Sequence, residues 1–202
     1  MRRAVHLWQK HRRFGALLVW RRTPQSTNAE QGQPMSNELK IEPIGVIETP
    51  FPEPAGTPIQ PLRANTARGK VRLEPRFWAG LQDLAGFERI WLIYWLHRQQ
   101  SAALVVTPFL DQQERGIFAT RAPARPTPIG LSAVRLLAVE EGVLKVAGVD
   151  MIDGTPLLDI KPYVPMFDSF PGSRVGWLGK SNSRLRLADG RFDTAPKTKL
   201  AK

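Results

Sequence analysis

The sequence predicts a mainly β protein, a single-domain β-barrel with one or two short helices, and three observations support this fold class. At least six short segments have strand character, and only one stretch has a convincing helical pattern. The strands do not alternate with helices, which argues against a doubly wound parallel sheet. Closing such strands into a barrel removes the exposed sheet edges that otherwise promote aggregation.

The first expected elements are two strands and one helix. Residues 40–48 have strand period and end at a proline-rich break. Residues 69–74, Gly-Lys-Val-Arg-Leu-Glu, alternate between apolar and polar side chains, as a half-buried strand does. Pro75 suits the first position of a helix, and residues 76–84 place three apolar side chains on one helical face.

The most apolar expected strand is residues 89–96, Arg-Ile-Trp-Leu-Ile-Tyr-Trp-Leu. Its β-branched and aromatic side chains occupy both faces, which predicts a strand buried on both sides with Trp91 and Trp95 in the core. Glu140-Glu-Gly142 is typical of a hairpin turn between two later strands. The remaining expected strands are residues 103–107, 116–120, 131–140 and 143–150.

Charge divides the chain into three parts. Residues 1–34 carry seven Lys or Arg against one acidic residue, residues 172–202 carry eight against two, and the stretch between them carries 14 against 15. The formal net charge of +11 therefore belongs to the two ends. We expect a disordered basic N-terminal extension over residues 1–36, the barrel domain over residues 37–171 and a basic tail over residues 172–202.

The N-terminal extension allows more than one interpretation. It is a poor secretory signal, because Arg21 and Arg22 directly follow its short apolar stretch and no small-residue cleavage site ends it. An organelle transit peptide fits the composition better. We favour a third interpretation, in which residues 1–34 are disordered or lie upstream of the true start, since a normal-looking domain begins at Met35. We expect a cytoplasmic protein.

The composition excludes several kinds of site. Without cysteine the chain has no disulfide, thiolate nucleophile or cysteine-ligated metal centre, and only His6, His11 and His97 could supply imidazole ligands. We therefore expect no metal site. We also expect no membrane span, because no run of 18 uncharged apolar residues is present. Neither the G-x-G-x-x-G nor the P-loop pattern occurs, which disfavours the common nucleotide-binding folds.

Residues 115–132 present two arginines in a loop that contains three prolines. Prolines restrict the backbone, so Arg121 and Arg125 lose little freedom when they bind. An arginine can hold a carboxylate with two parallel charged hydrogen bonds, and Arg121 is the better candidate for this role, with Arg125 second. A surface salt bridge from Arg121 to Asp111 or Glu114 is an equally open alternative.

Residues 150–165 form a second unusual stretch. Asp153-Gly154 indicates a tight turn, whose carboxylate and exposed backbone groups could bind ribose hydroxyls or an amino group. The alternative is an ordinary turn whose aspartate caps its own backbone. Tyr163 could stack on a base and Lys161 could pair with a phosphate, but a packed tyrosine and a surface lysine explain them at least as well.

His97-Arg98, at the end of the aromatic strand, is a further candidate site. A lone histidine is more often a structural residue, and the sequence shows no partner with which His97 would form a catalytic dyad.

Two motifs together resemble the TsaA-like family: Gly116-Ile-Phe-Ala-Thr-Arg-x-x-x-Arg-Pro-x-Pro-Ile-Gly130 and Asp150-x-x-Asp-Gly-Thr-Pro-x-x-Asp-Ile-Lys-Pro-Tyr-x-Pro165. The resemblance covers about residues 40–170. It implies an S-adenosylmethionine-dependent methyltransferase on a non-Rossmann β-barrel. It further implies a homodimer that methylates N6 of the threonylcarbamoyl-modified adenosine beside the anticodon, in the anticodon loop of tRNA.

Transferred residue by residue, the resemblance also implies site residues. Asp159 and Tyr163 are candidates for accepting the N6 proton. Thr127, Ile59 and Arg98 replace residues that are common in the family, which leaves donor binding intact and puts the choice of substrate in doubt. Two other functions stay open: a methyltransferase with a small-molecule acceptor, and a non-catalytic RNA-binding barrel that relies on its basic ends. The implied cofactor contacts are Pro58, Ile59, Gln60, His97, Arg98, Arg121, Leu131, Asp153, Gly154, Thr155 and Pro156.

Overall fold

The computed structural model describes residues 18–19, 40–64, 66–181 and 187–193. Contacts divide the chain into two compact units, residues 1–42 and 43–202. In the first unit β1 (Leu18–Val19) pairs antiparallel with β2 (Lys40–Ile41). The rest of the expected N-terminal extension, up to residue 36, lies outside the described residues. Within the described ranges, no helix has the length and hydropathy needed to span a bilayer.

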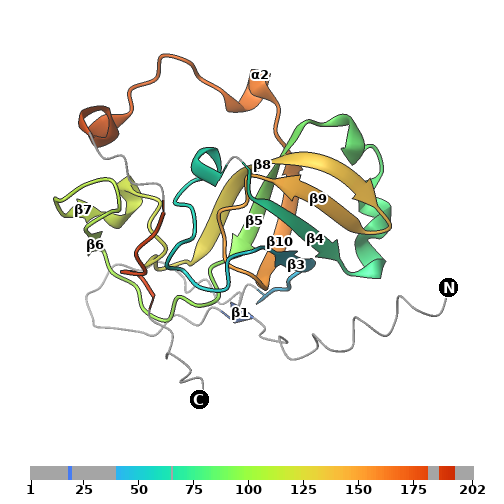
Figure 1. Ribbon diagram of the computed structural model, residues 1–202, viewed down its shortest axis with the longest axis horizontal. Coiled ribbons are helices and arrows are strands. Elements are labelled where there is room, and N and C mark those ends of the chain that lie inside the picture. Colours follow the sequence, from blue (N-terminus) through green and yellow to red (C-terminus); the bar gives the residue numbers. More distant parts are fainter. Residues whose placement is uncertain (1–17, 20–39, 65, 182–186, 194–202) are drawn as a thin grey trace, which may run out of the picture. The chain divides into compact units, whose positions relative to one another are not determined.

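The second unit is built around a closed antiparallel barrel, which confirms the mainly β fold class (Figure 1). Neighbouring strands follow the order β10, β3, β4, β9, β8, β5, and β5 pairs with β10 to close the barrel. Closure leaves no free edge on these strands. Their bounds are β3 (Gly45–Glu48), β4 (Arg68–Leu73), β5 (Arg89–Trp95), β8 (Ile129–Glu140), β9 (Val143–Ala147) and β10 (Thr155–Pro162).

Aliphatic side chains fill the interior of the barrel, and they come from alternate positions of each strand. Burying such a side chain completely contributes about 1.5–3 kcal/mol. The expected hairpin turn between β8 and β9 is confirmed, since Glu141 and Gly142 both have positive φ angles, 44° and 77°, as a tight two-residue turn requires. The fully buried side chains include Ile47, Val71, Ile90, Leu92, Val134, Leu144, Val146 and Leu157.

Strand β5 is buried on one face rather than on both. Ile90, Leu92 and Tyr94 point into the barrel, whereas Trp91 and Trp95 lie half-buried on its outer face. The prediction of two core tryptophans was therefore wrong. The outer face is covered only in part, and Trp91 packs there edge-on against Tyr163, with ring centroids 5.4 Å apart.

The sequence did not predict β10 as a strand, because Pro156 and Pro162 lack the N–H group that a central strand donates. The structure accommodates both prolines by changing the partner strand along β10. Its first three residues pair with β3, and a register shift between Leu157 and Asp159 precedes the rest of the pairing with β5. Pro162 is the last residue of the strand, where no further ladder bond is needed.

Other elements also differ from expectation. The helix expected over residues 76–84 is two 3₁₀ segments, η3 (Pro75–Leu81) and η4 (Leu84–Gly86), separated by Asp83 with φ of 64°. The segments expected as strands at residues 103–107 and 116–120 are not barrel strands. They overlap the small strand pair β6 (Val105–Val106) and β7 (Arg115–Gly116), and η5 (Ile117–Ala119) directly follows β7. The other short helices are η2 (Pro61–Ala64), α2 (Pro165–Asp168) and η6 (Gly176–Lys180).

Candidate functional site

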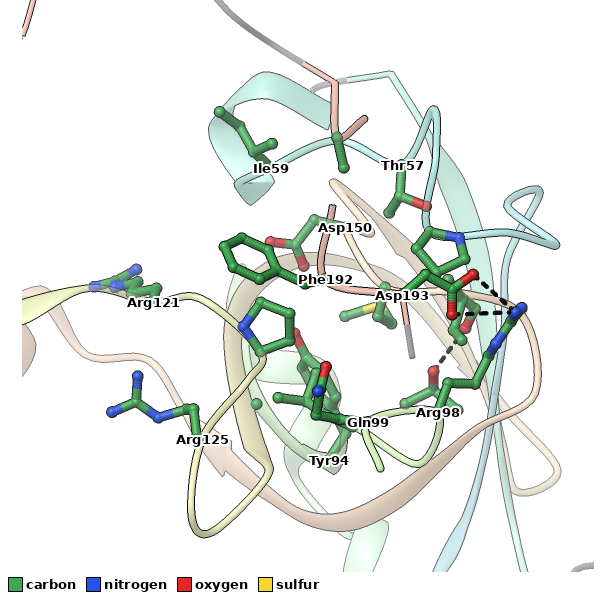
Figure 2. Close-up of a pocket in the computed structure, with 18 of the residues that line it drawn as sticks. Thr57, Ile59, Tyr94, Arg98, Gln99, Arg121, Arg125, Asp150, Phe192 and Asp193 are labelled. Carbon is green, nitrogen blue, oxygen red and sulfur yellow. Dashed lines mark hydrogen bonds and ion pairs between the residues drawn. The ribbon is translucent and has the colours of Figure 1, made fainter. Parts of the chain in front are cut away.

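One end of the barrel carries a pocket of about 360 Å³ (Figure 2). The register explains its position: Trp95 at the end of β5 pairs with Ile129 at the start of β8, and Thr155 at the start of β10 pairs with Ile47 near the end of β3. The loops that leave these strands therefore meet at one rim. The volume and the mostly apolar lining are typical of a small-molecule site.

The proline-rich loop forms one wall of the pocket and presents Arg121 to it. The Arg121 guanidinium donates a hydrogen bond to the side-chain oxygen of Gln60 at 3.1 Å and forms no ion pair with a described residue. The alternative, a salt bridge to Asp111 or Glu114, is not formed, and Asp111 pairs instead with Arg115 at 2.7 Å. Arg121 is therefore positioned by a neutral neighbour, and its charge is available to a ligand.

Arg125 has a different role, although it also lines the pocket. Its Nη1 donates to the backbone carbonyls of Ile117, at 3.1 Å, and of Thr120, at 2.9 Å. It thus ties the proline-rich loop to η5 and the residue that follows it. This contact holds Arg121 in place, since Arg121 directly follows Thr120 in the chain.

A half-buried carboxylate, Asp150, faces the same pocket three residues after β9. Its Oδ1 accepts a hydrogen bond from the Ser132 hydroxyl at 2.6 Å, and the Tyr94 hydroxyl lies 3.0 Å from Ser132 Oγ. Burial raises the pKa of the Asp150 carboxyl to about 7, while the Ser132 hydrogen bond and the charge of Arg121 lower it. Burial also raises the pKa of Tyr94, which stays a neutral hydroxyl that can donate a hydrogen bond.

Gly130 explains how Tyr94 reaches this position. A Cβ atom on Gly130 would overlap the Tyr94 ring, so only glycine lets the ring lie flat against β8 opposite it. Ser132 is a polar residue at a fully buried position of the same strand. The motif glycine therefore supports the hydrogen-bonded chain from Tyr94 through Ser132 to Asp150.

His97 and Arg98 also line the pocket, and Figure 2 shows Arg98 across it from Arg121. Arg98 bonds to Glu53 at 3.0 Å and to Asp193 at 3.2 Å. The His97 ring lies against Trp95, and burial lowers the pKa of its imidazole. His97 is thus neutral at physiological pH.

Residues 187–193, which the sequence placed in a basic tail, form part of the pocket wall. Leu187 makes a β-bridge with Pro58, and Ala188 exchanges backbone hydrogen bonds with residues 56 and 57. Phe192 contacts Phe109 edge-on at 5.1 Å and packs against the small apolar cluster around Ile117. This segment was missed because its own composition is polar, and only Phe192 indicates burial.

The Asp153-Gly154 turn has the expected geometry, with φ of 73° at Gly154, but a contact other than the expected ones. Asp153 Oδ1 accepts the backbone N–H of Thr49 at 2.9 Å, which joins the start of β10 to the end of β3. Thr155 is a pocket residue and is fully buried. The binding roles of Asp153, Gly154 and Pro156 stay predictions, because their side chains and backbone do not line the pocket.

Asp159 lies farther along β10 and Tyr163 directly follows its last residue, and neither lines this pocket. At about 3.3 Å per residue, Asp159 is about 13 Å beyond Thr155 and Tyr163 about 26 Å beyond it. Asp159 lines a second cavity beside η3 and η4, and its carboxylate pairs with Lys161 at 2.9 Å. Their catalytic role stays a prediction.

The pocket thus brings together most of the implied cofactor residues and adds some that the sequence did not single out. Tyr94 and Ser132 were missed because an inward-facing polar residue is recognisable only once the faces of the strands are known. Asp150 was missed because it follows β9 and only the fold brings it to Ser132. No group of three His, Asp or Glu side chains in the described ranges could hold a metal ion. The implied residues that line the pocket are Pro58, Ile59, Gln60, His97, Arg98, Arg121, Leu131 and Thr155.

Comparison with known proteins gives a consistent result. Residues 46–169 match the family described as the tRNA-methyltransferase O N-terminal domain. A Pyrococcus abyssi protein named a probable S-adenosyl-L-methionine-binding protein is 49% identical over 152 residues, which span 74% of this chain and 83% of that protein. A Homo sapiens protein named tRNA (adenine(37)-N6)-methyltransferase is 37% identical over 141 residues, which span 66% of this chain and 32% of that protein.

The crystal structure of TrmO from Pseudomonas aeruginosa superposes with a TM-score of 0.57 at 40% sequence identity. The match covers 67% of this chain and 60% of that one, so this chain spans less than two thirds of the solved protein. Both the sequence and the barrel support one assignment. The chain therefore belongs to the family of the tRNA-methyltransferase O N-terminal domain, as its two motifs indicated.

Proposed function

We propose that this protein is an S-adenosylmethionine-dependent methyltransferase that acts on N6 of the threonylcarbamoyl-modified adenosine next to the tRNA anticodon. The observation that carries the proposal is Arg121, a guanidinium without an ion pair among the described residues, in a mostly apolar pocket of about 360 Å³ that also contains the carboxylate of Asp150. The names of the relatives support the cofactor and the tRNA substrate.

The residues present fit S-adenosylmethionine. Arg121 and Gln60 would hold its carboxylate, since a guanidinium forms two parallel charged hydrogen bonds with such a group. Leu131, which is 50% exposed at the rim, would cover the adenine together with the other apolar residues of the pocket. When bound, the cofactor supplies the methyl group.

The chain's own contribution is alignment. Methyl transfer is a direct displacement, so holding the acceptor nitrogen in line with the methyl group can supply much of the rate. Arg125 fixes the loop through two backbone carbonyls, and Gly130 leaves room for Tyr94 of β5, which bonds to Ser132 of β8 beneath the pocket. These contacts hold the binding groups rigidly, as alignment demands.

The proposal includes a homodimer, which an exposed apolar surface supports. Met166, Phe167, Phe170 and Val175, in and after α2, are between 62% and 86% exposed. Several large apolar side chains exposed in one segment are a common feature of protein contact sites. Since Asp159 and Tyr163 do not line the pocket of their own chain, a second copy would have to bring them to it if they accept the N6 proton.

Mixing two inactive variants tests the shared site. Arg121→Ala and Asp159→Ala homodimers should each be inactive, and subunit exchange between them should restore about a quarter to half of the activity, because one site in each mixed dimer has both residues. Activity that stays absent after confirmed exchange would place both residues in one chain's site or exclude Asp159 from it.

The substrate and the cofactor need separate experiments. Calorimetric titration with S-adenosylmethionine should show binding by the wild type and a loss of affinity in Arg121→Ala. Purified tRNA with and without the threonylcarbamoyl group should then be methylated only when the group is present, as measured by mass spectrometry of the nucleosides. Equal methylation of both tRNAs would overturn the assignment of the modified adenosine. Fractionation of the source cells should place the protein in the cytoplasm.

A second candidate function keeps the same donor with a small-molecule acceptor. It is favoured by the charge of residues 35–171, which carry 14 basic and 15 acidic side chains, because a tRNA-sized partner normally requires several phosphate contacts. Affinity for tRNA that is weak and insensitive to salt would support this candidate over the first.

A further inference from the structure

Asp150 is a carboxylate in the pocket to which the proposed methyl transfer gives no role. Its carboxyl is oriented by the Ser132 hydroxyl and by the backbone N–H of Asp150 itself. The Ser132 hydroxyl donates to Oδ1 at 2.6 Å, so the Tyr94 hydroxyl, 3.0 Å from Ser132 Oγ, must in turn donate to Ser132. This chain of two hydroxyls fixes one oxygen of Asp150, and no described Lys, Arg or His forms an ion pair with the carboxylate. The hydroxyls position the group without neutralising it.

Arg121 is the cation that acts on Asp150. Both residues line the same pocket, and Arg121 is close enough for its charge to lower the pKa of the Asp150 carboxyl, although the two are not bonded to each other (Figure 2). An arginine and an aspartate that pair with each other cancel their charges. Here each is held by a neutral polar neighbour, Gln60 for the arginine and Ser132 for the aspartate.

Two opposite charges held apart in an apolar pocket complement a zwitterion. Free amino acids are zwitterions, and so is the amino-acid end of S-adenosylmethionine, where an ammonium and a carboxylate are attached to one carbon. Burying a charge without a partner is costly, so such a pocket favours ligands that carry both charges and rejects ligands that lack one of them.

We propose that the Asp150 carboxylate binds the α-ammonium group of the cofactor's amino-acid end while Arg121 binds its α-carboxylate. The inference rests on the proposed function, because it takes the cofactor from it. In this arrangement Ser132 and Tyr94 are positioning residues: they orient Asp150 and do not touch the ligand. The pocket then selects the whole donor and its demethylated product over fragments without the amino acid.

Calorimetric titration with S-adenosylhomocysteine and with its deaminated analogue, in which hydrogen replaces the α-amino group, tests this assignment. A charged hydrogen bond contributes about 1.5–3 kcal/mol, so the wild type should bind the deaminated analogue about 10–100-fold more weakly. Asp150→Asn should bind S-adenosylhomocysteine more weakly than the wild type does, by the same factor. Its affinity for the deaminated analogue should equal that of the wild type. The matched control is Glu140→Gln, an exposed carboxylate at the far end of β8 that pairs with Lys145 and should change neither affinity.

Proton release provides an independent readout. An ammonium beside Asp150 favours the ionised carboxyl, so binding of S-adenosylhomocysteine at pH 7 should release on the order of half a proton, measured by titration in buffers of different ionisation enthalpy. The deaminated analogue and Asp150→Asn should show none of this release. The other titratable or charged groups that line the pocket, Tyr94, His97, Arg98, Arg121, Arg125 and Asp193, are present in every arm and cancel in the comparison.

The outcomes separate the inference from the function on which it rests. If the wild type does not bind S-adenosylhomocysteine, the proposed cofactor is wrong and the inference fails with it. If it binds S-adenosylhomocysteine and the deaminated analogue equally, or if Asp150→Asn binds both as the wild type does, only the role of Asp150 is overturned. Should Asp150→Asn fail to fold, the two ligands compared on the wild type still decide the question.

Discussion

Replacing Asp150 with asparagine should stabilise the protein at neutral pH. Burial raises the pKa of the Asp150 carboxyl from 3.8 to about 7. The folded state therefore keeps a proton that the unfolded state has already lost, and the free energy of unfolding falls as the pH rises from about 4 to about 7 and is level above it. Asparagine resembles the protonated carboxyl, and its side-chain oxygen can still accept the Ser132 hydroxyl.

The magnitude follows from the pKa values. Each pH unit in this window corresponds to about 1.4 kcal/mol, so ionisation of Asp150 lowers the free energy of unfolding of the wild type by about 3 kcal/mol between pH 5 and pH 8. Asp150→Asn lacks this contribution. Between pH 5 and pH 8, the free energy of unfolding of the variant should therefore rise by about 3 kcal/mol relative to that of the wild type.

Urea unfolding at pH 5 and pH 8, followed by tryptophan fluorescence, measures this difference. Other titrating groups, including His97 with its lowered pKa, occur in both proteins and cancel. The same dependence on pH in both proteins would refute the reasoning and show that Asp150 is ionised in the folded state at pH 5. A confirmed gain in stability would mean that the carboxylate is kept at the expense of stability, as is common for functional residues.

Three further predictions concern other parts of the pocket. Arg121→Lys should reduce the affinity for S-adenosylhomocysteine about 10-fold in calorimetric titration, with little change in thermal stability, because lysine cannot form two parallel bonds to a carboxylate. An unchanged affinity would show that Arg121 does not hold the ligand's carboxylate. Gly130→Ala should displace the Tyr94 ring and lower the free energy of unfolding, measured in urea, by about 1–3 kcal/mol. It should also lower the affinity for S-adenosylhomocysteine. Unchanged stability would show that the ring can move aside without cost. Phe192→Ala should weaken binding several-fold, whereas Leu137→Ala, at a side chain 43% exposed and outside the pocket, should not affect it; equal effects would exclude Phe192 from the site.

Much of the barrel follows from local pattern. Alternating or apolar runs predicted β4, β5, β8 and β9, and Glu140-Glu-Gly142 predicted the turn between the last two, because strand period and turn chemistry are properties of a few neighbouring residues. Strand β10 was missed because its prolines are acceptable only in combination with two particular partner strands. That information is not local.

The sequence by itself determined the fold class, the family and the importance of the proline-rich loop, since motifs and backbone restrictions are written in consecutive residues. Only the tertiary structure decided what each charge does. The sequence ranked Arg121 ahead of Arg125, but only the structure shows that Arg121 bonds to Gln60 whereas Arg125 binds loop carbonyls. Asp150 became a candidate because barrel closure brings it to Ser132 and Tyr94, residues 18 and 56 positions away. Burial and charge pairing depend on distances between remote residues, which closure of the barrel sets.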